Sequence, residues 1–220
     1  TLFLTGASSG IGAATARAAA KAGWNIGLFA RSEDKLNDLA AEIGDQALVL
    51  VGDATDYDAQ KQALDKLANH FGGVDAAFAN AGRGTSPAGT ENGDPQDWKA
   101  MVDLNIMGAL YTAHAAMPHL RKTTGQYVVT GSAAGRVHIQ GSIYGATKWF
   151  IHGFAGNLAD EMAEWGGRCM VVSPGMVDTA FFDEAKPDKL HPEDVAAAVM
   201  HALEAPARAS IREIHLMPTD

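Results

Sequence analysis

Short apolar runs alternate with amphipathic stretches along almost the whole chain. The apolar runs read TLFLTG, NIGLFA, QALVLV, VDAAFA, QYVVTG, RCMVVS and REIHLM. They are too short and too uniformly apolar for strands with one face in water, because such strands alternate apolar and polar residues. The pattern therefore predicts seven short strands that are buried on both faces.

The stretches between these runs have the spacing of amphipathic helices. Helices are predicted over GAATARAAAKAG, SEDKLNDLAAEIG, DYDAQKQALDKLANHFG and PEDVAAAVMHALEA, and over about residues 97–122 and 142–165. Ser32 is expected to cap the second helix, whose first turn is acidic, and Pro192 takes the first-turn position that proline favours. Strands that alternate with helices indicate right-handed crossovers. The predicted fold is therefore α/β and doubly wound, a Rossmann-type fold with a seven-stranded parallel sheet and helices on both faces.

Composition narrows the possible partners. The chain has 220 residues, 47% hydrophobic and 20% charged, and is expected to form a single domain over residues 1–220. No apolar run approaches the ~20 residues of a membrane span, and no leader precedes the first strand, so we expect a cytoplasmic protein without a membrane partner. The net charge of -9 argues against a nucleic acid partner. Segment 82–95, rich in Gly, Pro, Ser and Asn, is predicted to be a mobile loop.

Cysteine and histidine do not suggest a metal site. Cys169 is the only cysteine and lies in the apolar run CMVV, so it is predicted to be a buried structural thiol. The eight histidines lack ligand-like spacing, and no metal is expected.

The segment TGASSGIG, residues 5–12, connects the first predicted strand to the first predicted helix. In a doubly wound sheet, a dinucleotide pyrophosphate rests on a helix N-terminus at this position. Gly6 suits the tight turn, Gly10 lets the backbone approach phosphate, and Gly12 lets the helix pack closely on the strand. A tight turn without any ligand is the alternative.

The spacing G-x-x-x-G-x-G resembles that of the short-chain dehydrogenase/reductase (SDR) family, and the similarity extends strand by strand over most of the chain. The resemblance implies a Rossmann-type fold and a nicotinamide dinucleotide bound at this turn. Ser8, Ser9 and Ile11 would contact it together with the three glycines.

The end of the second strand bears on the choice of cofactor. It reads LFARSE, with Ala30 where NAD-binding proteins usually carry an acid for the ribose 2′-hydroxyl. Arg31 follows, and a guanidinium binds the 2′-phosphate that a carboxylate would repel. The sequence therefore predicts NADP(H) in preference to NAD(H). An exposed arginine that leads into a helix is the other interpretation.

Further cofactor positions are implied by the resemblance. GDAT resembles the family's adenine-contacting segment, ANAG resembles its N-N-A-G with Ala79 in place of the first asparagine, and SPGMVDT resembles its P-G-x-V-x-T. The cofactor would then contact Asp53, Ala54, Asn80, Ala81, Gly82, Pro174, Gly175, Val177 and Thr179. A plain proline–glycine turn is the alternative for the last segment.

Tyr144 and Lys148 lie four residues apart in YGATK and share one face of the predicted helix. Taken alone, they could be an ordinary surface pair. However, Ser132 follows the fifth strand and Asn105 lies on the preceding long helix, which matches the Asn, Ser, Tyr and Lys of the SDR family in order and spacing. The resemblance implies that these four residues are catalytic, and that Tyr144 and Lys148 also contact the cofactor.

A lysine next to a tyrosine can make the phenol more acidic. A tyrosine with a pKa near 10 is ionised in only about one molecule in a thousand at neutral pH. A cation about 4 Å away, at an effective dielectric near 20, favours the phenolate by about 4 kcal/mol, which would lower the pKa by roughly 3. We therefore expect Lys148 to bring the pKa of Tyr144 into the range that acid–base catalysis uses.

The implied reaction interconverts a carbonyl and a secondary alcohol by hydride transfer with the nicotinamide. Tyr144 would protonate the developing alkoxide, and Ser132 would hydrogen-bond the same oxygen. By resemblance, Lys148 would hold the ribose hydroxyls and Asn105 would position a water in the proton relay.

The substrate, a small carbonyl or alcohol, is expected to contact Arg136, His138 and Gln140. It is also expected to contact the short segment AFFDEAKPDKLH. The shortness of this segment suggests an open pocket. Phe181, Phe182 and Met176 would favour an apolar ligand, or they may serve only in packing.

An apolar stripe of Trp149, Phe150 and Phe154 follows the catalytic pair. Because the SDR family commonly forms tetramers through its long helices, the resemblance implies a homotetramer, or a homodimer.

Three other functions compete with this hypothesis. A non-catalytic NADP-binding sensor or regulator would not need Ser132, Tyr144 and Lys148. A sugar-nucleotide epimerase or dehydratase would have a different glycine spacing and a larger C-terminal region. A structural protein without a ligand would leave the glycine turn unexplained.

Overall fold

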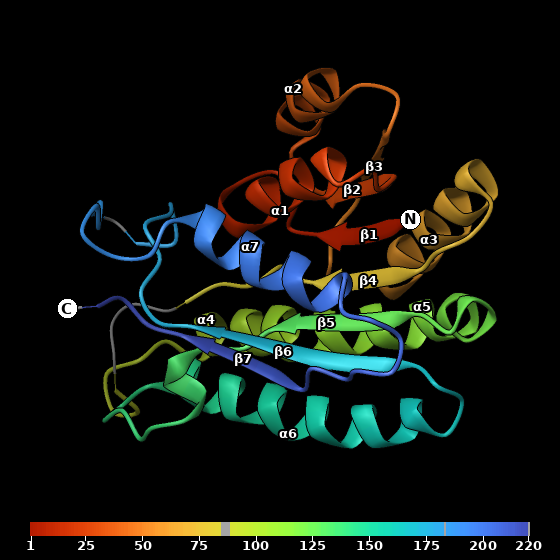
Figure 1. Cartoon of the computed structure of the whole chain (residues 1–220). Helices are drawn as coiled ribbons and strands as arrows, with labels where there is room; N and C mark the ends of the chain where they lie inside the picture. Colours follow the sequence, from red (N-terminus) through yellow and green to blue (C-terminus); the bar gives the residue numbers. More distant parts are fainter. Residues whose placement is uncertain (85–88, 183, 220) are drawn as a thin grey trace.

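The computed structural model describes residues 1–84, 89–182 and 184–219. In these residues seven strands form one parallel sheet in the order β3-β2-β1-β4-β5-β6-β7 (Figure 1). The strands are β1 (Leu2–Thr5), β2 (Ile26–Ala30), β3 (Ala47–Val51), β4 (Ala76–Ala79), β5 (Gln126–Thr130), β6 (Arg168–Pro174) and β7 (Glu213–Leu216). The predicted doubly wound fold is confirmed.

Helices cover both faces of the sheet. They are α1 (Gly10–Lys21), α2 (Glu33–Ile43), α3 (Tyr57–Phe71), α4 (Pro95–Val102), α5 (Ala109–Thr123), α6 (Ile143–Ala163) and α7 (Pro192–Leu203). Side chains of α1, α2 and α7 share one hydrophobic core with the sheet, and side chains of α3, α5 and α6 share the other (Figure 1).

Strand β1 shows why the apolar runs lack alternation. Leu2 and Leu4 belong to the core under α1 and α7, whereas Phe3 belongs to the core on the opposite face. All three side chains are fully buried, and each contributes about 1.5–3 kcal/mol relative to an exposed position. A strand covered on both faces therefore carries apolar residues at successive positions.

The predicted helix over residues 97–122 is interrupted by a π-helical turn, η1 (Asp103–Gly108), which joins α4 to α5. A π turn contains an additional residue per turn and is common at functional sites. It carries Asn105, so the helical spacing used in the sequence does not hold there.

Two other predictions need comment. Ser32 does precede α2, but its side chain makes no capping hydrogen bond, so the predicted cap is wrong in that respect. The predicted mobile loop of 82–95 includes residues 85–88, which lie outside the described residues. None of the helices in the described residues combines the length and apolar character needed to cross a membrane.

Substitution of Gly12 tests the close packing of α1 on β1. A Cβ atom at Gly12 would lie 2.1 Å from the backbone oxygen of Gly6, which cannot move without the turn. We expect Gly12→Ala to lower the unfolding free energy by about 2–3 kcal/mol and the melting temperature by roughly 5–10 °C.

Gly156→Ala is the matched control, because it lies on the exposed face of α6 and its Cβ would meet nothing within 4 Å. It should raise stability by up to about 1 kcal/mol. Equal melting temperatures for the two variants would contradict the predicted close contact.

Candidate active site

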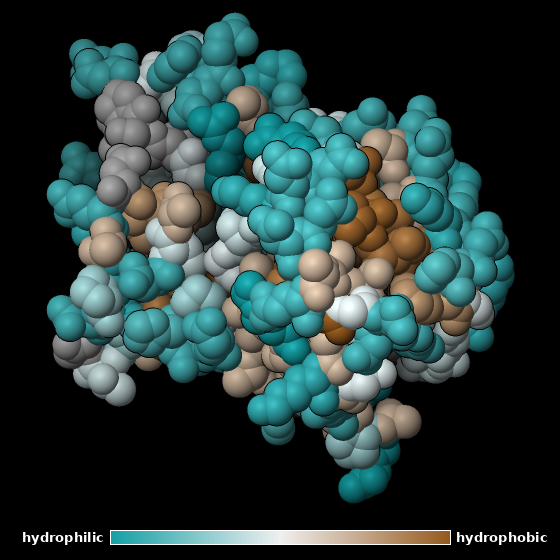
Figure 2. All heavy atoms as spheres, turned by 90° about the horizontal axis from the view of Figure 1, so that it is seen from above, coloured by the Kyte–Doolittle hydropathy of each residue, from teal (hydrophilic) through white to brown (hydrophobic). Residues whose placement is uncertain are grey.

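The carboxyl ends of the central strands open into a cleft of about 1000 Å³. In Figure 2 the molecule is hollowed on its left side, the side at which the strands of Figure 1 end. Most predicted cofactor positions line this cleft, namely Gly6, Ser8, Ser9, Gly10, Ile11, Arg31, Asp53, Ala54, Asn80, Ala81, Gly82, Tyr144, Lys148, Pro174, Gly175, Val177 and Thr179. Gly12 lies behind the turn, where it permits the contact with Gly6.

The glycine turn leaves the N-terminus of α1 available to an anion. Gly6 and Gly10 have φ values of 66° and 52°, in the left-handed region that favours glycine. Within the described residues, Ser9 makes no side-chain capping bond and the first turn carries no acid. A Cβ at Gly10 would lie 3.2 Å from Thr179 Cγ2, so Thr179 closes the turn from the opposite side. This geometry fits a pyrophosphate on the helix N-terminus.

Asn80 has a structural role that the sequence did not indicate. Its amide nitrogen donates to the backbone oxygens of Thr5 at 3.3 Å and Gly6 at 3.4 Å. Its amide oxygen accepts from Thr130 Oγ1 at 3.1 Å. Because its side chain is engaged in these bonds, it fixes the ends of β1 and β5 around the glycine turn.

Arg31 lies at the far end of the cleft with a largely free side chain, 78% exposed. Its guanidinium is 3.8 Å from Asp53 Oδ2, a loose surface pair of small energetic value. The other oxygen of Asp53 accepts from Thr55 N and Thr55 Oγ1, both at 2.9 Å. The Asp53 carboxylate is therefore fixed, whereas Arg31 can move toward a phosphate.

Ser132, Tyr144 and Lys148 come together where β5 ends and α6 begins. The Ser132 hydroxyl accepts from Ala134 N at 3.1 Å, and it lies close enough to Tyr144 to act on the pKa of the phenol. Lys148 is buried, and its Nζ donates to the backbone oxygen of Thr130 at 2.7 Å. Nζ lies 5.7 Å from the centre of the Tyr144 ring.

The prediction that Lys148 lowers the pKa of the Tyr144 phenol is wrong when only groups of the protein itself act on that phenol. Burial raises the pKa of the Tyr144 phenol above its usual value, and the hydrogen bond with Ser132 offsets part of that rise. Burial also lowers the pKa of Lys148 to about 8, because an ammonium is poorly solvated there. The sequence argument assumed a cation close to the hydroxyl and ignored the cost of burying both groups.

Asn105 lies beside this group but does not line the cleft. Its Oδ1 accepts from the backbone N–H of Arg83, and its Nδ2 donates to the backbone oxygen of Arg83, both at 2.9 Å. Nδ2 also lies 3.1 Å from Thr147 Oγ1. Asn105 thus ties the segment after β4 to α6.

The predicted substrate residues are only partly correct. Arg136, His138 and Gln140 do not line the cleft, whereas Val137 and Ile139 from the same loop do. Arg136 pairs with Glu213, and the His138 ring stacks on Trp149 with ring centres 5.6 Å apart.

The predicted apolar residues of the other wall are in place. Met176, Phe181 and Phe182 all line the cleft. The ring centre of Phe181 lies 5.5 Å from that of Tyr144.

Comparison with known proteins agrees with this geometry. Residues 1–190 match the family model described as short chain dehydrogenase. The chain belongs to the short-chain dehydrogenase family. Sulfoacetaldehyde reductase 2 of Chromohalobacter salexigens is 35% identical over 236 residues, covering 99% of this chain and 94% of the relative.

Solved structures of other family members superpose over nearly the whole chain. The serine dehydrogenase from Escherichia coli is 28% identical, with a TM-score of 0.91 and coverage of 99% of this chain and 97% of that one. An alcohol dehydrogenase from Thermococcus sibiricus, complexed with 5-hydroxy-NADP, is 29% identical, with a TM-score of 0.91 and coverage of 99% and 96%. This short-chain dehydrogenase is therefore an oxidoreductase that acts on CH–OH groups with NAD(P).

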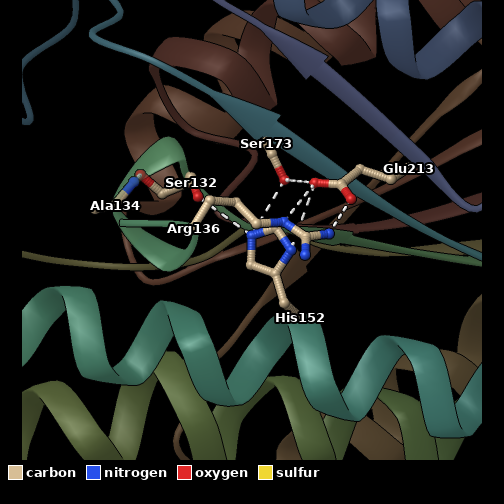
Figure 3. Close-up of polar contacts among 6 residues, drawn as sticks. All are labelled: Ser132, Ala134, Arg136, His152, Ser173 and Glu213. Carbon is tan, nitrogen blue, oxygen red and sulfur yellow. Dashed lines mark hydrogen bonds and ion pairs between the residues drawn. The ribbon is translucent and has the colours of Figure 1, made fainter. Parts of the chain in front are cut away.

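A partly buried polar network lies behind Ser132 in this short-chain dehydrogenase (Figure 3). His152 Nε2 lies 3.2 Å from the backbone oxygen of Ser132 and 3.2 Å from Ser173 Oγ. Because a carbonyl oxygen only accepts, Nε2 must carry the proton in this bond. Ser173 Oγ donates to Glu213 Oε1 at 3.0 Å, and Arg136 Nε donates to the same oxygen at 3.1 Å.

This network connects the last strand of the sheet to the loop that carries Ser132. His152 Nδ1 makes no hydrogen bond among the described residues and lies 3.5 Å from Glu213 Oε1. Burial lowers the pKa of His152, with Arg136 and Lys148 acting in the same direction, while the bond to Ser132 and the charge of Glu213 oppose the shift. Neutral His152 is therefore the form that the fold favours.

Several supporting residues were missed by sequence reasoning, notably Thr5, Thr130, Thr147, His152 and Glu213. The one available signal was a threonine at the end of two mostly apolar strands, β1 and β5. The buried Cys169 agrees with its prediction, since burial raises the pKa of its thiol to about 12. Among residues 1–84, 89–182 and 184–219, no group of His, Cys, Asp or Glu is arranged to hold a metal ion.

The lowered pKa of His152 predicts a pH dependence of stability. The unfolded chain takes up the proton at a pH near 6.5, before the folded protein does, so stability is retained above that pH and lost as the pH falls below it. His152→Gln keeps a hydrogen-bond donor but cannot titrate. We expect urea unfolding between pH 7 and 5 to show a smaller loss of unfolding free energy for this variant than for the wild type.

Asn157→Ala, on the exposed face of α6, serves as a non-titrating control and should keep the wild-type slope. Parallel slopes for the wild type and His152→Gln would contradict this prediction.

Proposed function

We propose that this short-chain dehydrogenase is an NADP(H)-dependent enzyme that interconverts a carbonyl and a secondary alcohol. The observation that carries the proposal is the joint placement of Ser132, Tyr144 and Lys148 in a cleft that begins at the glycine turn. A protein that only bound a dinucleotide would not need a serine, a phenol and a buried lysine together at this place.

The cleft fits a nicotinamide dinucleotide along its length. The turn of Gly6 to Ile11 would hold the pyrophosphate, Lys148 the ribose next to the nicotinamide, and Pro174 to Val177 the nicotinamide itself. The recorded bond of Lys148 to Thr130 uses one of its three N–H donors, which leaves donors for ribose hydroxyls. When bound, the dinucleotide would supply the hydride.

Tyr144 is suited to act as the acid in the direction of reduction. Because burial raises its pKa, the phenol carries its proton at neutral pH and can transfer it to a developing alkoxide. Ser132 and Tyr144 would then hold the carbonyl oxygen between two donors. The nicotinamide ring of an oxidised dinucleotide is positively charged and would favour the phenolate in the reverse direction.

The role of Asn105 in a proton relay stays a prediction. Its Oδ1 accepts one N–H from Arg83 and keeps a second lone pair, with which it could hold a water. Its position also supports the relay, since a Cβ at Gly82 would lie 3.3 Å from Oδ1 and 3.8 Å from Lys148 Nζ.

The preference for NADP(H) rests on Arg31. Relatives of this fold have been solved with NADP+ and with NADH, so the fold alone does not decide the cofactor. An exposed guanidinium with only a loose partner is available to a 2′-phosphate, and Ala30 places no carboxylate there.

The homotetramer, or homodimer, also stays a prediction. Trp149 and Phe150 are 43% and 41% exposed on α6, while Phe154 is packed against the core. This exposed pair is consistent with association through α6.

Tyr144→Phe tests the proposed proton donor. Removal of the hydroxyl should lower kcat by about 10²- to 10⁴-fold in carbonyl reduction, because the alkoxide loses its acid. Binding of NADPH, measured by fluorescence, should change by less than about threefold. Tyr111→Phe, which lies outside the cleft, should keep wild-type turnover, and retained activity in Tyr144→Phe would refute the assignment.

Arg31→Ala tests the choice of cofactor. Loss of the guanidinium should lower kcat/KM with NADPH by roughly 10- to 100-fold and leave kcat/KM with NADH within about twofold, since charge-assisted bonds contribute about 1.5–3 kcal/mol. Lys35→Ala, an exposed cation one helical turn further along, should change neither value. A wild-type enzyme that uses NADH as well as NADPH would overturn the preference.

A further inference from the structure

Apolar side chains are concentrated at the substrate end of the cleft. Among the described residues, nine large hydrophobic side chains are exposed, and five of these line the cleft: Val137, Ile139, Met176, Phe181 and Met217. We call these five residues the apolar mouth. They are between 44% and 54% exposed, which is unusual for side chains of this size unless a ligand or partner covers them.

The apolar mouth is built from three separate segments next to Tyr144. Val137 and Ile139 lie in the loop before α6, Met176 and Phe181 follow β6, and Met217 follows β7. The Phe181 ring lies beside Tyr144 and against Gly84, where a Cβ would come within 2.9 Å of the ring. Through Phe181, the apolar mouth reaches the place where the reacting carbon would lie if Tyr144 is the proton donor.

The charged side chains that line the cleft already have partners. Arg31 and Asp53 lie together at the end away from Tyr144. Nearer the mouth, Arg83 pairs with Asp97, and Asp103 pairs with Lys99 at 2.5 Å.

Two further cations near Ser132 are also engaged. Lys148 donates to Thr130, and Arg136, the nearest cation in the loop before α6, is bound to Glu213 behind Ser132. Near Ser132, a substrate carboxylate or sulfonate would therefore find no cation among the described residues that is neither paired with an acid nor, like Lys148, assigned to the ribose.

We propose that the substrate is an uncharged, apolar carbonyl compound, or the corresponding secondary alcohol, whose hydrocarbon part is covered by the apolar mouth. This inference rests on the proposed reductase function and narrows it. It separates this chain from relatives that are named for sulfoacetaldehyde and serine, both of which carry charge at neutral pH.

Two matched ketone series test the substrate class with saturating NADPH. Along 2-butanone, 2-hexanone and 2-octanone, kcat/KM should rise about two- to fourfold for each added methylene, the factor expected for burial of a CH2 group. Acetophenone should exceed 4-acetylbenzoate in kcat/KM by at least about 30-fold, although the two ketones share the same reacting group.

A matched pair of variants locates the effect. Phe181→Ala should lower kcat/KM for 2-octanone by about 10-fold and leave that for 2-butanone within about twofold. Val51→Ala removes an apolar side chain of similar exposure, 50% against 44%, that does not line the cleft, and should change neither value.

The outcomes separate this inference from the function on which it rests. Equal or faster turnover of 4-acetylbenzoate, or a flat 2-ketone series, would overturn the apolar substrate and leave the reductase standing. Binding of NADPH without turnover of any ketone or alcohol would overturn the reductase, and the substrate class with it.

Discussion

The hydrogen bond from the buried Lys148 ammonium to the end of β5 is the interaction on which the site depends. Lys148 Nζ donates to the backbone oxygen of Thr130, and the hydroxyl of Thr130 donates to Asn80 Oδ1. The amide nitrogen of Asn80, Nδ2, donates in turn to the backbone oxygen of Thr5. This series of bonds runs from α6 across the ends of β5, β4 and β1. It fixes the helix that carries Tyr144 relative to the turn that would receive a pyrophosphate.

Burial of this lysine has an energetic cost that the rest of the fold must offset. Its pKa of about 8, against an ordinary value of 10.5, corresponds to roughly 3 kcal/mol of lost solvation for a cation at neutral pH. Burial raises the pKa of Tyr144, so that its phenol keeps its proton. The site is thus held in the protonated state that the proposed reduction would use, at the expense of stability.

Much of this could be predicted from the sequence, because it depends on local patterns. Apolar runs predicted the strands, and helical spacing predicted the helices. The glycine spacing and the Tyr144–Lys148 pair indicated where the cleft lies.

The remainder depends on contacts that no local pattern encodes. The π turn at Asn105 changes a helix by one residue, and the loop from Gly135 to Gly141 has no period, so which of its side chains face the cleft could not be predicted. The pKa of Tyr144 was predicted with the wrong sign because burial can be known only from the whole fold.

The apolar mouth has a consequence for how such a protein can diverge. None of its five side chains belongs to either hydrophobic core, and all of them lie on loops after the strands or before α6. If they cover the substrate as proposed, replacing them would alter selectivity while the sheet, the glycine turn and Tyr144 keep their positions. Gene duplicates could therefore drift toward new metabolites by exchanging a few loop residues, with little risk of misfolding along the way.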